Sequence, residues 1–202
     1  MRVLIACEFS GVVREAFRRR GNVTYSCDLL PADDNSIWHK RMDVLQLIAE
    51  STSGYFDLMI AHPPCTYLSV SGLHWNKRRP ARAAETERAL EFVLRLLEAP
   101  IPRIALENPI GIISTRIRRP DQIIQPYQFG HDASKATCLW LKGLPQLQPT
   151  CMVQPRMVNG KPRWGNQTDS GQNRLGPSPD RWKLRSVTYS GIAEAMANQW
   201  SS

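Results

Sequence analysis

A pair of prolines at the end of an apolar strand constrains the fold of this chain more than any other feature. The run 56–61 (FDLMIA) has the length and composition of a buried strand, and His62-Pro63-Pro64-Cys65 follows it. Two consecutive prolines fix two φ angles and remove two backbone donors, so the chain must leave the sheet in one rigid, extended form. The thiol of Cys65 is therefore held at the carboxyl end of a strand, where open α/β sheets bind their ligands.

Strand and helix patterns alternate through the first two thirds of the chain. The patterns predict strands over 2–7, 23–28, 56–61 and 103–107, and helices over 10–20, 43–52 and 81–99. Two later apolar stretches, 122–129 and 137–141, are predicted to be closing strands. This alternation predicts an α/β fold in which a parallel sheet is covered by helices on both faces.

The character of the sequence changes after Gly143. Residues 144–188 hold many Pro, Gly, Asn and Gln residues with little periodicity, which predicts an irregular, reduced lobe. Residues 189–202 carry apolar residues at helical spacing and are predicted to pack a last helix on the core. The predicted organisation is therefore a main α/β domain over 1–143, the lobe over 144–188 and the C-terminal helix.

The composition favours a polyanionic partner. Lys and Arg number 26 against 18 Asp and Glu, which gives a net charge of +8 and favours nucleic acid or a nucleotide, although many soluble enzymes are equally basic. No apolar run approaches the roughly 20 residues that cross a bilayer. The five cysteines and four histidines form neither a disulfide framework nor a metal motif. We therefore expect a cytoplasmic monomer with reduced thiols, no metal and no membrane contact.

The turn after the first strand has features of a ligand-binding loop. Glu8-Phe9-Ser10-Gly11 places small residues beside the first helix, whose N-terminal N–H groups are expected to be free. Asp28 and Asp43 suit a ligand that offers hydroxyl groups and an exocyclic amine. These features favour a nucleoside-type cofactor across the strand tips, although a helix cap and solvated acids are common in any α/β protein.

A second strand end carries a carboxyl group. Glu107 and Asn108 follow the apolar run 103–106, so burial is expected to raise the pKa of Glu107 and make it a proton donor near neutrality. Beside Cys65, this permits thiolate attack on carbon 6 of a pyrimidine while Glu107 protonates ring nitrogen 3, after which carbon 5 takes an electrophile. Cations in the loop 77–82 are expected to lower the pKa of the Cys65 thiol or to hold phosphates, although a solvated loop fits them equally well.

In these motifs the chain resembles the DNA (cytosine-5-)methyltransferase family, in a short form of the kind found among phage and prophage proteins. Phe9-Ser10-Gly11 is similar to the first cofactor motif, Pro63-Pro64-Cys65 to the nucleophile motif and Glu107-Asn108-Pro109 to the Glu-Asn-Val segment of that family. The resemblance covers roughly residues 1–142.

The resemblance implies a Rossmann-like, S-adenosylmethionine-dependent methyltransferase fold. It implies methyl transfer to carbon 5 of a flipped or single-stranded cytosine in DNA, through a covalent cysteine adduct. The implied catalytic residues are Cys65, Glu107 and Asn108. The implied contacts to S-adenosylmethionine come from Glu8, Phe9, Ser10, Gly11, Asp28, Leu29, Asp43 and Pro63. The implied nucleic-acid contacts come from Lys77, Arg78, Arg79, Arg82 and Lys135.

The sequence also departs from the family. Val12-Val13 stands where the first motif usually ends in glycine, Thr66 replaces a glutamine, and the large target-recognition domain has no room. Two other interpretations therefore stay open: the same chemistry on a free pyrimidine nucleotide or modified base, and a non-catalytic DNA-binding relative. Within the lobe, backbone or stacking contacts to DNA are expected from Arg156, Lys161, Arg163, Trp164, Arg174 and Arg181.

Overall fold

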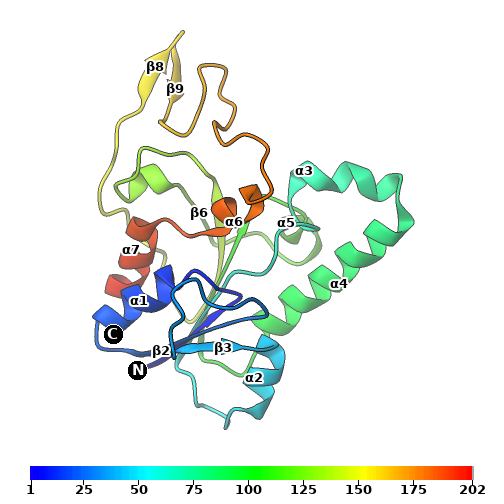
Figure 1. The fold of residues 1–202 in the computed structure, drawn as a ribbon, viewed down its shortest axis with the longest axis vertical. Coiled ribbons are helices and arrows are strands. Elements are labelled where there is room, and N and C mark those ends of the chain that lie inside the picture. The colour runs from blue at the N-terminus through cyan, green and yellow to red at the C-terminus, as the bar shows by residue number, and fades with distance from the viewer. Residues whose placement is uncertain (202) are drawn as a thin grey trace.

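A seven-stranded sheet forms the centre of the protein in the computed structural model, which describes residues 1–201 apart from the side chains of Ser71, His74 and Lys77 (Figure 1). The strand order is β3-β2-β1-β4-β5-β7-β6. The strands are β1 (Arg2–Ala6), β2 (Val23–Asp28), β3 (His39–Arg41), β4 (Leu58–Ala61), β5 (Arg103–Pro109), β6 (Gln122–Ile124) and β7 (Thr137–Lys142). This is the doubly wound order 3-2-1-4-5-6 with β7 inserted beside β5, so the predicted Rossmann-like α/β fold is confirmed at this level.

The expectation of an all-parallel sheet is wrong at one strand. β7 runs antiparallel to both of its neighbours, β5 and β6, while β1 to β5 pair in parallel. A parallel return from β6 would need a crossover, usually a helix. The connection over 125–136 holds only the 3₁₀ turn η2 (Pro126–Gln128), so the chain turns back beside β6.

Helices cover both faces of the sheet. On one face α1 (Val12–Arg19) and α7 (Ser190–Trp200) pack on the side chains of Val3 and Ile5. On the other face α4 (Pro80–Leu97) packs with Leu4 and Ala6, together with α2 (Val44–Glu50) and α5 (Ile113–Arg116). Because successive side chains of a strand point to opposite faces, a strand buried on both sides is apolar at every position.

Two predicted segments differ from the structure. The strand predicted over 122–129 ends at Ile124, because Pro126 has no N–H for a ladder and begins η2 instead. β3 was not predicted, since His39, Lys40 and Arg41 show no apolar pattern. After the Pro-Pro turn, α3 (Val70–Leu73) and η1 (His74–Lys77) lead into α4.

The C-terminal lobe is built on a hairpin that projects away from the sheet (Figure 1). β8 (Arg156–Val158) and β9 (Lys161–Arg163) pair antiparallel across Asn159-Gly160, both of which have positive φ. Arg156 pairs with Asp169 at 2.6 Å, and the ring of Trp164 stacks on Tyr127 with centroids 4.4 Å apart. The chain then returns to the main domain through α6 (Arg181–Ser186). Within residues 1–201, no helix combines the length and the apolar character that a membrane span requires.

Candidate active site

The candidate site lies at the carboxyl edge of the sheet, where the strand order reverses between β1 and β4. Ligands of doubly wound folds bind at this position, because the loops leaving the two strands diverge there. The β1 loop carries Glu8-Phe9-Ser10-Gly11, and the β4 loop carries the Pro63-Pro64-Cys65 turn. The two predicted motifs are therefore on adjacent strands, which pair from Val3↔Leu58 to Ala6↔Ala61.

The β1 loop is fixed by its own buried carboxylate. Glu8 is buried and accepts hydrogen bonds from the backbone N–H groups of Val13 (2.6 Å) and Arg14 (3.2 Å). Burial raises the pKa of Glu8 more than His62, these two amides and the Arg14 charge lower it. The expectation of free N–H groups at the start of α1 is therefore wrong for Val13 and Arg14, which Glu8 already satisfies.

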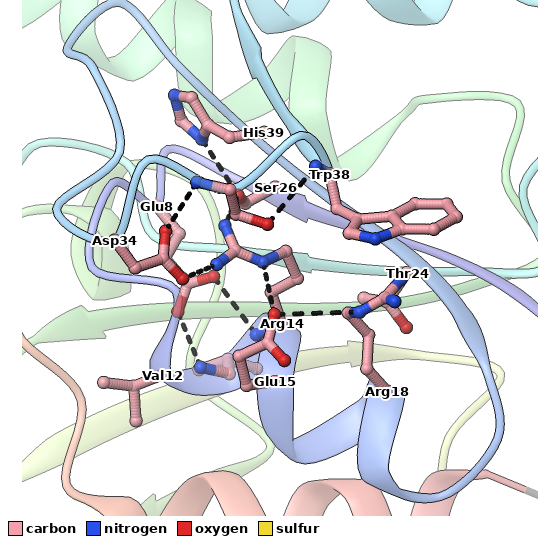
Figure 2. Close-up of polar contacts among 12 residues, drawn as sticks. Glu8, Val12, Arg14, Glu15, Arg18, Thr24, Ser26, Asp34, Trp38 and His39 are labelled. Carbon is pink, nitrogen blue, oxygen red and sulfur yellow. Dashed lines mark hydrogen bonds and ion pairs between the residues drawn. The ribbon is translucent and has the colours of Figure 1, made fainter.

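A buried arginine ties α1 to β2 and to the loop that follows β2 (Figure 2). The Arg14 side chain is fully buried, donates to Ser26 Oγ (2.7 Å) and to Glu15 Oε1 (2.9 Å), and forms an ion pair with Asp34. Gly11 adopts φ 74°, and a Cβ there would lie 2.4 Å from Arg14 Nη2. A glycine is therefore required at this turn by both conformation and space.

A cavity of about 340 Å³ opens beside this loop. Four strand ends line it, through Cys7 after β1, Asp28 at the end of β2 with Leu29 after it, Asp43 after β3 and Pro63 after β4. The structure thus brings together four of the predicted cofactor contacts. The opposite wall is largely apolar and includes Tyr67, Leu68, Ala89 and Phe92. The volume of the cavity lies within the range of small-molecule sites, roughly 300–1,000 Å³.

The two aspartates in this cavity have one oxygen engaged each. Asp28 Oδ1 accepts from the N–H of Leu30 at 2.9 Å, and Asp43 Oδ1 caps α2 by accepting from Leu45 at 2.7 Å. Within residues 1–201, the second oxygen of each carboxylate accepts no hydrogen bond from the protein. Both aspartates therefore have an acceptor available for a hydroxyl or an amine.

Burial favours the neutral thiol form of Cys7 and Cys27, the two cysteines that line this cavity. It raises the pKa of Cys27 to about 12 and raises that of Cys7 further. Cys27 is buried within β2, as predicted. Cys7 lies just beyond β1 with φ 59°, so the predicted strand over 2–7 ends one residue early.

Phe9 and Ser10 lie around a second, smaller cavity of about 40 Å³. Its walls are Cys7, Glu8, Phe9, Ser10, His62 and the segment 186–188. Cys7 lines both cavities, so they meet at the end of β1. The structure therefore separates the predicted cofactor contacts into two adjacent groups, while Gly11 shapes the loop and lines neither cavity.

The Pro-Pro turn is tied to the neighbouring strand. Asn108 of β5 is buried and donates from Nδ2 to the carbonyl of Pro63 at 2.7 Å. The carbonyl of Cys65 accepts from the N–H groups of Leu68 (3.1 Å) and Ser69 (3.0 Å), which closes the next turn. The Cys65 residue is exposed. The predicted catalytic residue Asn108 is thus a brace that fixes the backbone two residues before the thiol.

Glu107 is paired with His62, a residue that the motifs did not single out. Glu107 Oε2 lies 2.8 Å from His62 Nδ1, and the two side chains are only 13% and 12% exposed. Burial opposes both charges, but the hydrogen bond and the mutual attraction outweigh it. The pKa of His62 is therefore raised and that of Glu107 lowered. The expectation that the pKa of Glu107 is raised is wrong, because a cation within hydrogen-bond distance overrides desolvation.

The predicted basic contacts have different environments. The guanidinium groups of Arg78 and Arg79 lie over the ring of Trp75, 5.8 and 4.8 Å from its centroid. Arg82 donates to the carbonyls of Gly72 (3.2 Å) and Thr66 (2.7 Å), so it braces the loop after Cys65. The side chain of Lys77 lies outside the described residues.

The fifth predicted basic contact, Lys135, is engaged at the other side of the site. Its Nζ donates to the carbonyl of Arg185 at 2.8 Å, which joins the loop before β7 to α6. Its charge is close enough to lower the pKa of Glu107. Thr188, which follows α6, also lowers the pKa of Glu107. The segment 185–188 therefore borders the site, and no sequence motif predicted its place there.

Comparison with known proteins assigns no family to the chain. No family model and no curated protein matches it. Among solved structures, it is similar to a low-resolution structure of WbdD with an ordered C-terminal bundle, with a TM-score of 0.38 and 12% identity. The match covers 82% of this chain and 34% of the WbdD chain, so this chain spans about a third of that structure. A similarity at this level does not establish a shared fold.

Proposed function

We propose that this protein transfers a methyl group from S-adenosylmethionine to carbon 5 of cytosine in DNA. One observation carries the proposal: an exposed thiol, a buried carboxylate and a ligand-sized cavity lie at one edge of one sheet. Cys65 follows the turn that Asn108 ties to β5, and Glu107 is the residue before Asn108. The cavity of about 340 Å³ reaches the same turn through Pro63 and Pro64.

The residues of the larger cavity fit the proposed cofactor. The available oxygens of Asp28 and Asp43 suit ribose hydroxyls and an exocyclic amine, and the apolar wall with Phe92 suits the faces of a purine ring. S-adenosylmethionine bound there would supply an electrophilic methyl group.

The chain's own residues would activate the base. The thiolate of Cys65 forms a bond to carbon 6 of cytosine, the electrons of the 5,6 double bond move into the ring, and nitrogen 3 takes up a proton on the Glu107 side. Carbon 5 then carries the nucleophilic electron pair. It would bond to the methyl group that the cofactor supplies, with S-adenosylhomocysteine as the leaving group. Loss of the carbon 5 proton to water then breaks the bond between sulfur and carbon 6, which restores the 5,6 double bond and the thiolate, and the proton of nitrogen 3 returns to the Glu107 side.

Two features support DNA as the proposed partner: the net charge of the protein and the exposed arginines in the loop after Cys65. The net charge of +8 favours a polyanion, and the exposed Arg78 and Arg79 lie in the loop that follows Cys65. A base inside a duplex does not expose carbon 6 to a nucleophile, so the target must be flipped out or single-stranded. A free pyrimidine nucleotide is the second candidate, because the lobe over 144–188 holds little beyond one hairpin and one short helix.

The test is transfer of labelled methyl from S-adenosylmethionine to mixed DNA, followed by nucleoside analysis. We expect 5-methylcytosine from the wild type and none from Cys65→Ala, which should still bind the cofactor. Ala89→Trp fills the larger cavity and should abolish cofactor binding, whereas Ala84→Trp on the exposed side of α4 is its matched control. Transfer by Cys65→Ala would overturn the proposal, and activity on a mononucleotide alone would favour the second candidate.

A further inference from the structure

His62 lies close to two carboxyl groups. Its Nδ1 contacts Glu107 Oε2 at 2.8 Å, and the charge of Glu8, on the neighbouring β1 loop, also acts on it. Its Nε2 is buried, has no protein partner among the described residues and belongs to the wall of the small cavity. A ring nitrogen within hydrogen-bond distance of a carboxylate is best protonated, and a second acidic group nearby favours the positive charge further. The surroundings therefore favour the charged, doubly protonated ring.

The charges that face His62 come from three elements. Glu107 belongs to β5, Glu8 follows β1, and Lys135 precedes β7 and opposes the positive charge. Thr188 lowers the pKa of Glu107 and so helps to keep it ionised. Two carboxyl groups against one ammonium leave the balance in favour of a proton on the ring.

We propose that His62 is a positioning residue that stores the proton delivered to cytosine nitrogen 3 through Glu107. The inference rests on the proposed function. In the resting protein Glu107 is a carboxylate and cannot itself protonate the base, so the proton must come from a neighbour. His62 Nδ1, 2.8 Å from Glu107 Oε2, is the neighbour in hydrogen-bond contact with that oxygen.

The proton balance is simple. As the Cys65 sulfur bonds to carbon 6 and negative charge moves onto nitrogen 3, the proton on Nδ1 passes to Glu107 Oε2 and the carboxyl group protonates nitrogen 3. His62 is left neutral and Glu107 is again a carboxylate. When the thiolate leaves, the proton returns by the same route. No oxidant or further reactant is needed.

The first test measures exchange of the hydrogen on carbon 5 of cytosine with solvent deuterium, in DNA and without cofactor. Reversible attack by Cys65 makes carbon 5 basic, so exchange reports the activation step alone. His62→Gln keeps a hydrogen-bond donor but removes the titrating proton. We expect exchange to slow by about 100-fold at pH 7.5, the scale of general acid catalysis. His39→Gln, which alters a histidine bonded to Ser26 instead, should change it little.

The pH profile separates a proton store from a structural role. In the wild type, exchange should fall at alkaline pH as the ring loses its proton, and in His62→Gln this fall should move to lower pH. A merely structural role would lower the rate without moving the fall. An unchanged rate and profile would overturn the inference while leaving the proposed function intact. An absence of exchange and of methyl transfer in the wild type would overturn both.

A second measurement needs no activity. Nitrogen NMR of the ring should show His62 titrating above its ordinary pKa in the wild type and at lower pH in Glu107→Gln, which is nearly isosteric. Equal midpoints in the two proteins would show that Glu107 does not hold the proton on His62, and would overturn the inference whatever the kinetics show.

Discussion

Breaking the ion pair between Arg14 and Asp34 tests how strongly α1 is anchored to the loop after β2. The Arg14 side chain is fully buried, whereas Asp34 is 41% exposed. Removing one partner of a fully buried pair costs about 3–5 kcal/mol, and an exposed pair contributes about 0–1 kcal/mol. Arg14 keeps its bonds to Ser26 and Glu15 when Asp34 is lost, so an intermediate coupling energy of about 1.5 kcal/mol is expected.

A double-mutant cycle with Arg14→Met and Asp34→Ala measures this coupling. Asp34 also accepts from the N–H of Ser36, and that contribution is present in both backgrounds and cancels. Asp34→Ala should therefore cost about 2 kcal/mol in the wild type and about 0.5 kcal/mol beside Arg14→Met. Arg14→Met itself should change the free energy of unfolding by only about 1 kcal/mol in either direction. The substitution relieves the cost of a buried charge but also loses the hydrogen bonds of that charge, and the two effects oppose each other.

The assay is urea unfolding followed by circular dichroism, with equal slopes required in all four proteins. A coupling energy near zero would contradict the reasoning, since solvent at Asp34 would then screen the pair completely. A coupling above about 3 kcal/mol would contradict it in the other direction, because the pair would behave as fully buried.

Two further predictions concern stability. Gly111→Ala should cost about 3 kcal/mol by overpacking, since its Cβ would lie 2.0 Å from the carbonyl oxygen of Leu68, whereas Gly176→Ala, with no atom within 4 Å, should stay within about 0.5 kcal/mol in the same unfolding assay. The raised pKa of His62 gives stability that is complete below the unfolded value of 6.5 and is lost as pH rises through the folded value. The lowered pKa of Glu107 gives stability that is present above 4.5 and is lost as pH falls through the folded value. His62→Gln should therefore lose most stability between pH 4.5 and 6.5 and less at pH 9, and an equal loss at both would contradict the pairing.

The sheet and its helices were largely predictable because burial on both faces leaves a local signature. Each buried strand is a short apolar run, and each covering helix repeats its apolar residues at helical spacing. The direction of β7 and the presence of β3 were not predictable in this way. The orientation of β7 depends on which connection reaches it, and β3 pairs with β2 through its backbone, with no apolar pattern of its own.

The sequence of the C-terminal lobe contains a recognisable turn. Asn159-Gly160 is a typical two-residue hairpin turn, since both residues accept positive φ. It lies in the region predicted to be irregular, and it forms the turn between β8 and β9.

The candidate site was predictable where it depends on strand ends and unpredictable where it depends on partners. Asp28, Asp43 and Pro63 share a cavity because the ends of neighbouring parallel strands meet at one edge. The charge of Glu107 depends instead on His62, 45 residues away in the sequence. The register of β4 and β5, with Ala61 opposite Leu106, places the next residues His62 and Glu107 level with each other. The register of the two strands is therefore enough to predict the pair.

The packing of α1 against α7 also bears on how the protein is made (Figure 1). Phe17 of α1 shares a core cluster with Met196 and Trp200 of α7, and Arg19 pairs with Glu194 across 175 residues. At synthesis rates of roughly 5–20 residues per second, about 10–35 s separate the emergence of the two helices. During that interval the apolar side of α1 lacks its native packing partner. The nascent chain therefore exposes an apolar surface that chaperones can bind until α7 leaves the ribosome.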